Sequence, residues 1–363
     1  MKYLFAGGGT GGHIFPAIAI ADEIRKLDSD ASILFIGAEG RIEEKIVPQN
    51  GYKLKTIRIS GIDRKNFFKN ILLPLKVMRS ITRSKEIIRG FKPDAAVGTG
   101  GFVCGPVIHS AFKMGIPVLI QEGNSFAGKT IKMLSERADR VVINFDETRK
   151  YLKRNDNVIK IPHPVRSTLE IKDRDASIRN FGLDPVNKTV LIFGGSQGAR
   201  GINEVIARIL PEIFINEINV IWQTGSPEYE KTKDSFGQYA SGVKILKFID
   251  KMDEAYSAAD LVICRAGITS IMELGLLKKA SILIPLPGSA EEHQVKNALS
   301  LKKLGAAEVI LQQDAGENLL NEILRLLSDI GRLSELQKNI SGIGDRDAAK
   351  KIAEEVIKLA GRN

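Results

Sequence analysis

The sequence contains few cysteines and few aromatic residues, and both scarcities restrict the kind of protein that it encodes. Cys104 and Cys264 are the only cysteines among 363 residues, and neither belongs to a Cys-x-x-Cys pair. We therefore expect neither a disulfide framework nor a structural zinc site, which fits a reducing compartment. Aromatic residues make up 6% of the chain and no nucleic-acid-binding module is recognisable, so we expect no nucleic-acid partner.

The chain also lacks a long hydrophobic run. Its longest stretch without a charged residue, 95–112, is interrupted by several glycines and by Pro106, which disfavour a continuous helix across a bilayer. At the start of the chain, no basic region precedes a hydrophobic segment, so we expect no secretory signal. Any membrane contact is accordingly expected to be peripheral.

Acidic residues are outnumbered, because 43 aspartates and glutamates accompany 53 lysines and arginines and leave a net charge of +10. Most of the excess lies between Arg64 and Lys92, where nine basic residues accompany a single acid, Glu86. Apolar residues alternate with them, and an apolar surface ringed by basic groups suits anionic lipid. A solvated basic helix face is the alternative interpretation. The residues that we expect at a membrane surface are Phe67, Lys69, Leu73, Lys76 and Arg79.

Short apolar runs alternate with amphipathic helical patterns along the whole chain, which is typical of parallel βαβ construction. The length suits two domains, and each half begins with a buried strand, a glycine-rich turn and a helix. We predict an α/β protein of two Rossmann-like domains whose parallel sheets face a central cleft. The predicted strands are 3–6, 33–36, 54–59, 95–98, 118–121, 141–144, 190–193, 220–223, 244–248, 261–264, 282–285 and 308–311.

The proline-rich segment Ile161–Arg166 predicts the domain boundary, since its two prolines disfavour helix and strand pairing alike. The first domain is therefore predicted at 1–163 and the second at 164–344. The helical segment 345–363 has no following strand, and its pattern leaves open which domain it packs on.

Five glycines in GGGTGGH, residues 7–13, separate the first predicted strand from a helix. Glycines at such a turn let the backbone approach a ligand closely, and the helix N-terminus offers N–H groups to an anion such as phosphate. The glycines also match the G-x-G-x-x-G of dinucleotide sites, but the required ribose-binding acid would be Glu39, beyond the strand end. An NAD(P)-dependent oxidoreductase is therefore the weaker alternative. His13 follows the loop directly, where a neutral imidazole can accept a proton, and we interpret it as a candidate general base.

Other glycine-rich segments have the same character. GTGGFVCGP at 98–106 should open on the same sheet edge as the first loop, although close packing of strand on helix would also explain its glycines. GGSQGAR at 194–200 and CRAGITSIMEL at 264–274 place anion-ready helix starts in the second half. EEHQVKNA at 291–298 offers polar side chains after a strand, but amides at a helix start are often only caps.

Together, the motifs resemble those of the MurG family of bacterial N-acetylglucosaminyltransferases, over essentially the whole chain. They are GGTGGHIFPA, KPDAAVGTGGFVCGP, HPVR, GGSQGAR, FID, CRAGITSIMEL and EEHQVKNA, in the family's order and spacing. The resemblance implies a GT-B fold, with the donor UDP-GlcNAc bound mainly by the second domain and the acceptor, lipid I, by the first. It implies inverting transfer of N-acetylglucosamine to the 4-hydroxyl of the lipid-linked muramoyl-pentapeptide, giving lipid II, at the cytoplasmic face of the membrane. It also implies that the last helix returns to the first domain.

The family's motifs also imply roles for individual residues. His13 is the candidate catalytic base, and Glu122 is a second candidate. The segment QEGN at 121–124 departs from the family's common HEQN at Gln121 and Gly123 but keeps the asparagine.

The two glycine loops of the first domain could flank one diphosphate, so Gly9, Gly100 and Gly101 are expected at the acceptor diphosphate. By resemblance, Ile249 meets uracil through its backbone, Glu273 meets the ribose, and Gln294 meets the sugar. The full set expected to contact the donor is Thr10, Gly11, Gly12, Asn124, Arg166, Ser196, Ile249, Ile268, Thr269, Ser270, Ile271, Met272, Glu273 and Gln294.

The chemistry of this transfer needs a base and an anion clamp. A base supplies about 10²- to 10⁴-fold, and helix termini near Ser196 and Thr269 offer preorganised dipoles to the departing UDP. No acidic pair forms a convincing metal cage, so we predict no metal site and no cofactor. Another GT-B transferase that uses a different lipid or small aglycone, and a non-catalytic membrane scaffold, are the remaining alternatives.

Overall fold

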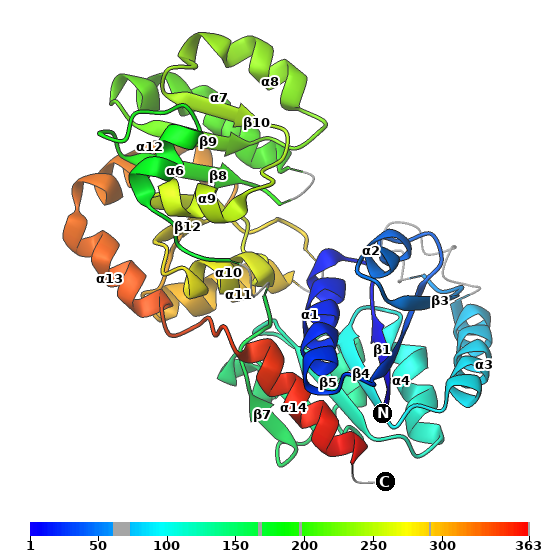
Figure 1. Ribbon diagram of the computed structural model, residues 1–363. Helices are drawn as coiled ribbons and strands as arrows, with labels where there is room; N and C mark the ends of the chain where they lie inside the picture. Colours follow the sequence, from blue (N-terminus) through cyan, green and yellow to red (C-terminus); the bar gives the residue numbers. More distant parts are fainter. Residues whose placement is uncertain (61–72, 166–168, 196–197, 290–291, 362–363) are drawn as a thin grey trace. The chain divides into compact units, whose positions relative to one another are not determined.

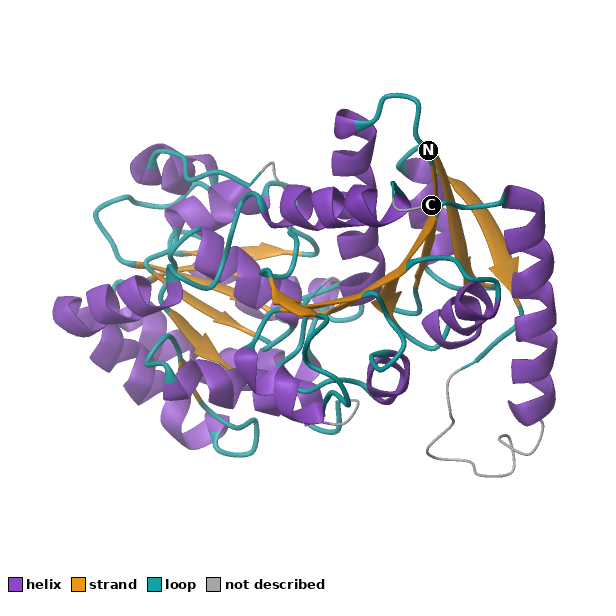
Figure 2. Ribbon diagram, turned by 90° about the horizontal axis from the view of Figure 1, so that it is seen from below, coloured by secondary structure: helices purple, strands orange, loops and turns teal. Residues whose placement is uncertain are grey.

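The computed structural model describes residues 1–60, 73–165, 169–195, 198–289 and 292–361, and the chain divides into two compact units. Unit 1 comprises Met1–Ser167 and Arg346–Asn363, and unit 2 comprises Thr168–Asp345. The chain therefore leaves unit 1 just after the proline-rich segment and returns to it later. Each unit holds one parallel sheet with helices packed against it (Figure 1 and Figure 2).

The sheet of unit 1 has seven parallel strands in the order β3-β2-β1-β4-β5-β6-β7. Every strand predicted for this part of the chain is present, and the structure adds β7 at the sheet edge. Because β1 pairs with β2 on one side and β4 on the other, the chain reverses its direction of travel across the sheet there. The strands are β1 Lys2–Gly7, β2 Ser32–Ala38, β3 Lys53–Ile57, β4 Ala95–Gly100, β5 Val118–Glu122, β6 Arg140–Ile143 and β7 Val158–Lys160.

Strand residues of unit 1 alternate between two apolar cores. In β1, Tyr3 and Phe5 belong to one core, whereas Leu4 and Ala6 belong to the other. Since successive strand residues point to opposite faces, each face needs its own helical cover. Helices α3, α4 and α5 cover one face, and α1 and α14 cover the other. The helices are α1 Gly11–Leu27, α2 Glu43–Gln49, α3 Leu73–Phe91, α4 Cys104–Lys113, α5 Lys129–Leu134, the 3₁₀ helix η2 Asp146–Tyr151 and α14 Ala348–Ala360.

Helix α14 belongs to unit 1 although all of unit 2 precedes it in the sequence. Its buried residues Ile352 and Val356 share a core with Ile14 and Ile20 of α1, and Figure 1 shows the red α14 in the same unit as the blue α1. An ion pair of 3.4 Å between Arg140 Nε and a carboxylate oxygen of α14 adds a polar contact to the sheet.

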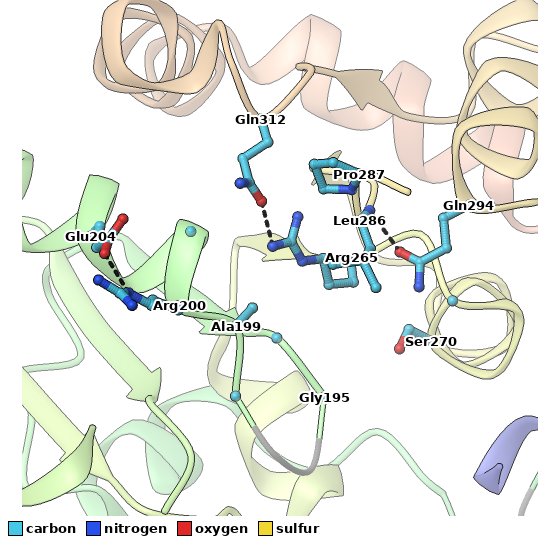
Figure 3. Close-up of a pocket in the computed structure, with 14 residues that line it drawn as sticks. Gly195, Ala199, Arg200, Glu204, Arg265, Ser270, Leu286, Pro287, Gln294 and Gln312 are labelled. Atoms are coloured by element: carbon cyan, nitrogen blue, oxygen red, sulfur yellow. Dashed lines mark hydrogen bonds and ion pairs between the residues drawn. The ribbon is translucent and has the colours of Figure 1, made fainter. Parts of the chain in front are cut away.

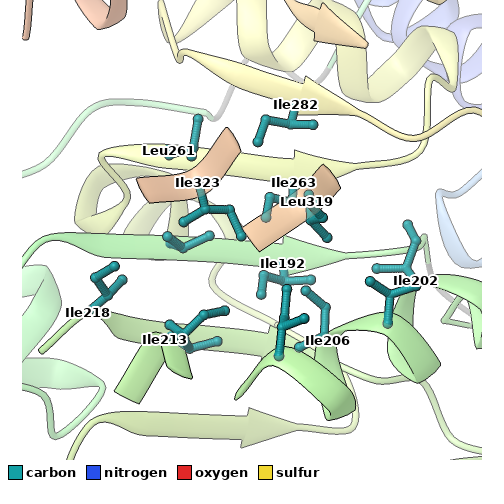
Figure 4. Close-up of a cluster of buried hydrophobic side chains, with 14 of the residues drawn as sticks. Ile192, Ile202, Ile206, Ile213, Ile218, Leu261, Ile263, Ile282, Leu319 and Ile323 are labelled. Atoms are coloured by element: carbon teal, nitrogen blue, oxygen red, sulfur yellow. The ribbon is translucent and has the colours of Figure 1, made fainter. Parts of the chain in front are cut away.

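The sheet of unit 2 has six parallel strands in the order β10-β9-β8-β11-β12-β13. Each strand predicted for this part of the chain is present. They are β8 Thr189–Phe193, β9 Asn219–Gln223, β10 Val243–Leu246, β11 Leu261–Cys264, β12 Ser281–Leu283 and β13 Glu308–Val309. One core packs Ile192 and Ile263 of the sheet against Ile206 of α7 and Leu319 and Ile323 of α12 (Figure 4).

The helices of unit 2 follow the same strand–helix alternation as those of unit 1. They are α6 Arg174–Asn180, α7 Arg200–Ile215, α8 Tyr229–Phe236, the 3₁₀ helix η3 Gly237–Tyr239, α9 Met252–Ala258, α10 Ile268–Leu276, α11 His293–Lys303, α12 Ala315–Ser328 and α13 Ile330–Ile340. None of the helices in the described part of the chain combines the length and the apolar character needed to cross a bilayer.

Candidate active site

The predicted functional residues lie mainly at the carboxyl edge of each sheet. In unit 1 the loops that leave the adjacent strands β1 and β4 lead to helices on opposite faces, and such a divergence opens a crevice where α/β proteins bind ligands. In unit 2 the same arrangement recurs, since β8 lies between β9 and β11. The strand order therefore brings the glycine loops of each unit to one edge of its sheet.

His13 lies in the first turn of α1, and its ring packs against Gly100 and Gly101 of the glycine loop after β4. Gly100 and Gly101 have positive φ angles of 102° and 81°. A Cβ atom on Gly100 would lie 2.7 Å from His13 Cδ2, and one on Gly101 would overlap the Gly8 carbonyl oxygen. Thr99 Oγ1 donates to the His13 carbonyl at 2.7 Å, and Thr10 Oγ1 lies 3.0 Å from His13 Nδ1. These glycines therefore make room for the imidazole, while their predicted contact with a diphosphate stays a prediction.

Glu43, at the start of α2, forms hydrogen bonds with the glycine loop after β1. Its side chain is fully buried, and its carboxylate accepts the Gly9 N–H at 3.1 and 3.2 Å and the Ala38 N–H at 2.9 Å. Cβ atoms on Gly8 or Gly37 would collide with this side chain. The Gly9 amide is thus already engaged, so an anion at this loop has to use other groups. This role of Glu43 could not be predicted from the sequence, because acids at a helix start ordinarily only complement the helix dipole.

Glu122 and Asn124 organise the loop after β5. Glu122 is 6% exposed, and its Oε1 accepts from both the backbone N–H and the side-chain amide of Asn124, at 2.9 and 3.0 Å. Its Oε2 accepts from the Gly128 N–H at 3.0 Å. The carboxylate therefore holds Asn124 in place at the same sheet edge as the glycine loops.

The departure of the QEGN segment from the family's common HEQN is explained by His163, a buried residue of the proline-rich segment. Gln121 Nε2 lies 2.9 Å from His163 Nδ1, and Asn144 Oδ1 accepts the His163 backbone N–H at 3.1 Å. A Cβ atom on Gly123 would overlap the ring, so glycine is required there. Burial, and secondarily the charge of His13, lowers the pKa of His163 to about 3. This imidazole is therefore neutral at physiological pH.

In unit 2 a cavity of about 620 Å³ opens beside the glycine loop that follows β8, a volume typical of small-molecule sites. Of the predicted donor residues, Ser270 and Gln294 line it, together with Gly195 and Arg200 of the GGSQGAR motif. Gln294 Oε1 also accepts the Leu286 N–H at 3.0 Å (Figure 3). The predicted residues Ser196 and Arg166 lie outside the described residues.

Arg265 lines the same cavity and had no role in the sequence analysis, although it directly follows β11. It is 7% exposed, and it donates to the carbonyls of Ile284 and Pro285 at 3.0 and 3.1 Å. It also donates to Gln312 Oε1 at 2.6 Å (Figure 3). Burial lowers the pKa of Arg265 to about 10, so the guanidinium stays cationic at neutral pH. A fixed positive charge therefore borders the cavity.

Among the other predicted donor residues of unit 2, Glu273 and Ile249 are held by hydrogen bonds. Tyr256 donates through its hydroxyl to Glu273 Oε2 at 2.9 Å, and Glu273 is 6% exposed. The Ile249 N–H donates to a side-chain amide of β9 at 2.8 Å. The side chains of Ile271 and Met272 are fully buried, so their predicted contact with the donor cannot involve an exposed side chain. The remaining members of the run, Ile268 and Thr269, stand at the start of α10.

No cluster of three or more histidine, cysteine, aspartate or glutamate side chains that could hold a metal occurs among the described residues. In the predicted membrane segment, Lys76 and Arg79 are exposed on α3, and Leu75 and Met78 beside them are 46% and 66% exposed. Leu73 begins this helix, whereas Phe67 and Lys69 lie outside the described residues.

Comparison with known proteins assigns this arrangement to a family. The glycosyltransferase family 28 N-terminal domain matches residues 3–143, and the C-terminal domain of that family matches residues 189–355. The UDP-N-acetylglucosamine--N-acetylmuramyl-(pentapeptide) pyrophosphoryl-undecaprenol N-acetylglucosamine transferase of Bacteroides fragilis is 44% identical over 99% of this chain and 96% of its own. The enzyme of that name from Flavobacterium psychrophilum is 39% identical over 99% and 97%.

The crystal structure of Acinetobacter baumannii MurG matches with a TM-score of 0.78 and 26% identity over 98% of this chain and 99% of its own. The chain belongs to the MurG family. The GT-B fold expected from the family's motifs is thereby confirmed, with its two parallel α/β sheets. The UDP-GlcNAc 2-epimerase of Neisseria meningitidis, at 14% identity and a TM-score of 0.68 over 99% of this chain and 100% of its own, shares the fold alone.

Proposed function

We propose that this protein transfers N-acetylglucosamine from UDP-GlcNAc to the 4-hydroxyl of the muramoyl-pentapeptide of lipid I, giving lipid II for peptidoglycan synthesis. The observation that carries the proposal is the 44% identity, over 99% of the chain, to the Bacteroides fragilis transferase. The oxidoreductase alternative loses support because both halves of the chain match the domains of glycosyltransferase family 28. UDP-GlcNAc and lipid I are thus the two substrates.

His13 is the general base of the proposed reaction. The acceptor hydroxyl must lose its proton as it attacks the anomeric carbon, and an imidazole is suited to take it at neutral pH. A neutral His13 that donates from Nδ1 to the Thr10 hydroxyl, 3.0 Å away, presents Nε2 as the basic nitrogen. Glu122 is the weaker candidate because both of its oxygens already hold backbone N–H groups.

Unit 2 is the donor domain in this proposal, and unit 1 is the acceptor domain. Negative charge builds on the UDP diphosphate as the glycosidic bond breaks, and preorganised positive groups stabilise it most effectively. Around the cavity of unit 2, the start of α7 at Arg200, the start of α10 at Ile268 and the buried cation of Arg265 supply such groups. The chemistry of these residues requires no metal ion.

The test is UDP release from UDP-GlcNAc by the purified protein, with and without a soluble short-chain lipid I analogue, with the product mass measured. Release that depends on the analogue and adds one N-acetylhexosamine is the expected result. UDP release without transfer to this acceptor would refute the proposed acceptor.

The role of His13 is tested with His13→Ala. Turnover should fall by about 10²-fold or more, while the affinity for UDP-GlcNAc stays close to that of the wild type. His109→Ala is the matched control, since His109 lies in the same unit outside the glycine loops and is partly exposed. A His13→Ala enzyme that keeps wild-type turnover would remove His13 from the mechanism.

We also propose that the exposed face of α3 attaches the protein peripherally to the cytoplasmic face of the membrane. Two basic side chains, Lys76 and Arg79, flank the exposed Leu75 and Met78, and each basic residue near an anionic surface contributes about 1 kcal/mol. Reversal of both charges to glutamate should therefore weaken binding to anionic vesicles by about 30-fold or more. Lys231→Glu with Lys244→Glu, two exposed lysines of unit 2, gives the same change in net charge as a control. Equal binding of both double variants in a sedimentation assay would refute the proposal.

A further inference from the structure

The carboxyl edge of β9 separates two loops that the proposed donor site needs. In the sheet of unit 2, β9 lies between β8 and β10. The loop after β8 carries Gly195, which lines the cavity, and the loop after β10 carries Ile249, the predicted uracil contact. Gln223 is the last residue of β9 and is 4% exposed. Its side chain therefore stands between Gly195 at the cavity and the loop that carries Ile249.

Both ends of the Gln223 amide are used, one on each loop. Nε2 donates to the Gly195 carbonyl at 2.9 Å, and Oε1 accepts the Ile249 N–H at 2.8 Å. The Gly195 carbonyl also accepts the Gly198 N–H at 2.9 Å. A Cβ atom on Gly198 would overlap the Thr224 carbonyl, so β9 contacts this loop at a second point. Gly195 and Gly198 thus both contact the end of β9, and Gln223 links Gly195 to Ile249.

We propose that Gln223 is a positioning residue for the nucleoside diphosphate of the donor. This inference rests on the proposed function, because that function places a UDP-sugar over these loops. A single buried side chain bonded to both loops sets the spacing between them before the ligand arrives. Preorganisation of this kind increases affinity because the ligand does not have to order the loops itself. Gln223 touches no reacting atom in this scheme, so it acts on binding and leaves the chemical step alone.

Two substitutions separate the contributions of the amide. Gln223→Glu keeps the shape and the acceptor for the Ile249 N–H, but it places an acceptor against the Gly195 carbonyl where a donor stood. Gln223→Leu removes both bonds and leaves a buried N–H and C=O without this partner. Loss of such buried partners lowers the population of the correct loop arrangement, and we expect the Kd for UDP to rise about tenfold or more in both variants.

Asn219→Leu is the matched control. Asn219 is a fully buried amide at the opposite end of the same strand, bonded to the Asp184 carbonyl at 2.6 Å and to Thr189 Oγ1 at 3.3 Å. Its loss should lower the melting temperature of the protein through the same kind of unsatisfied buried group. The Kd for UDP should nevertheless stay within about twofold of the wild-type value, because neither donor loop is touched.

The experiment is calorimetric titration of UDP into the full-length wild type and the three variants, with melting temperatures measured in parallel. In the transferase assay, both Gln223 variants should raise KM for UDP-GlcNAc and leave kcat at saturating donor within about threefold. Unchanged UDP affinity in both variants would overturn the proposal. An equal loss of affinity in Asn219→Leu would also overturn it, by showing a general effect of destabilisation. Wild-type protein that binds UDP but transfers no sugar would contradict the proposed function alone, and wild-type protein that binds no UDP would contradict both.

Discussion

Replacement of His163 by asparagine should remove an acid-sensitive contribution to the stability of unit 1. His163 is 2% exposed, and its pKa is lowered to about 3 by burial and by the charge of His13. In the unfolded chain the pKa returns to about 6.5. An asparagine Oδ1 can take the place of Nδ1 as the acceptor for the Gln121 amide, so this substitution removes the titration and keeps the hydrogen bond.

The size of the effect follows from the two pKa values. Above about pH 6.5 neither state binds a proton, so His163 contributes no pH dependence there. Below this pH the unfolded chain gains a proton that the folded chain excludes, and stability is lost until the pH falls to about 3. One pH unit in this window corresponds to about 1.36 kcal/mol. Wild-type protein should therefore lose about 2 kcal/mol through His163 between about pH 7.5 and about pH 5, whereas His163→Asn should not.

The assay is native-state hydrogen exchange at these two pH values, followed in peptides from β5 and β6 and corrected for intrinsic exchange rates. The fluorescence of Trp222, a buried residue of unit 2, serves as a control. Its change between the two pH values should be the same in the wild type and in His163→Asn. The quantity of interest is the difference between wild type and variant in the pH dependence of the opening free energy. A difference below about 0.5 kcal/mol would refute the reasoning, since the folded protein would then protonate His163 as readily as the unfolded chain does.

Substitutions at three other positions test the packing around the glycine loops of unit 1 and around Glu273 in unit 2. Gly100→Ala places a methyl group against the His13 ring at a backbone φ of 102°. Turnover should therefore fall about tenfold or more, while UDP binding measured by calorimetry is retained. Wild-type turnover would contradict the inferred packing of the His13 ring against Gly100. Glu43→Ala removes the acceptor of the buried Gly9 and Ala38 N–H groups. The opening free energy of unit 1, measured by hydrogen exchange, should therefore fall by about 2 to 6 kcal/mol. The loss should be smaller in Glu43→Gln, which keeps one side-chain oxygen as an acceptor. Tyr256→Phe removes the hydroxyl that donates to Glu273, so KM for UDP-GlcNAc should rise about 2- to 12-fold with kcat unchanged. An unaltered KM would show that this hydrogen bond to Glu273 does not support donor binding.

The fold was largely predictable from the sequence because buried parallel strands appear as short apolar runs. Such runs predicted every strand except β7, whose three residues are Val158, Ile159 and Lys160. β7 was missed because it is short, lies at the sheet edge and ends immediately before the proline-rich segment. Strand ends shifted by one or a few residues where glycine continues a ladder, as in β4, which runs on to Gly100.

The candidate site was predictable only as far as its glycine loops and His13. The glycines indicated that some group approaches the backbone closely, but they could not show whether that group is a ligand or a side chain of the protein. In unit 1 the Glu43 carboxylate, the His13 ring and the His163 ring fill the spaces that a Cβ would occupy. Gln223 and Arg265 were missed for a related reason, since their roles depend on backbone groups of segments that follow other strands, and only the folded sheet brings these segments together.

The interrupted course of unit 1 through the sequence has a consequence for its synthesis. Helix α14 covers the face of the sheet to which Tyr3 and Phe5 point, yet all of Thr168–Asp345 is translated before it. At about 5 to 20 residues per second, on the order of ten to forty seconds separate the last strand of unit 1 from this helix. Throughout that interval, one apolar face of the sheet of unit 1 lacks the cover of α14 in the nascent chain. Unit 2 is continuous in the sequence, so its core can be completed before that of unit 1. The nascent protein is therefore most exposed to aggregation and to chaperone binding in its oldest segment.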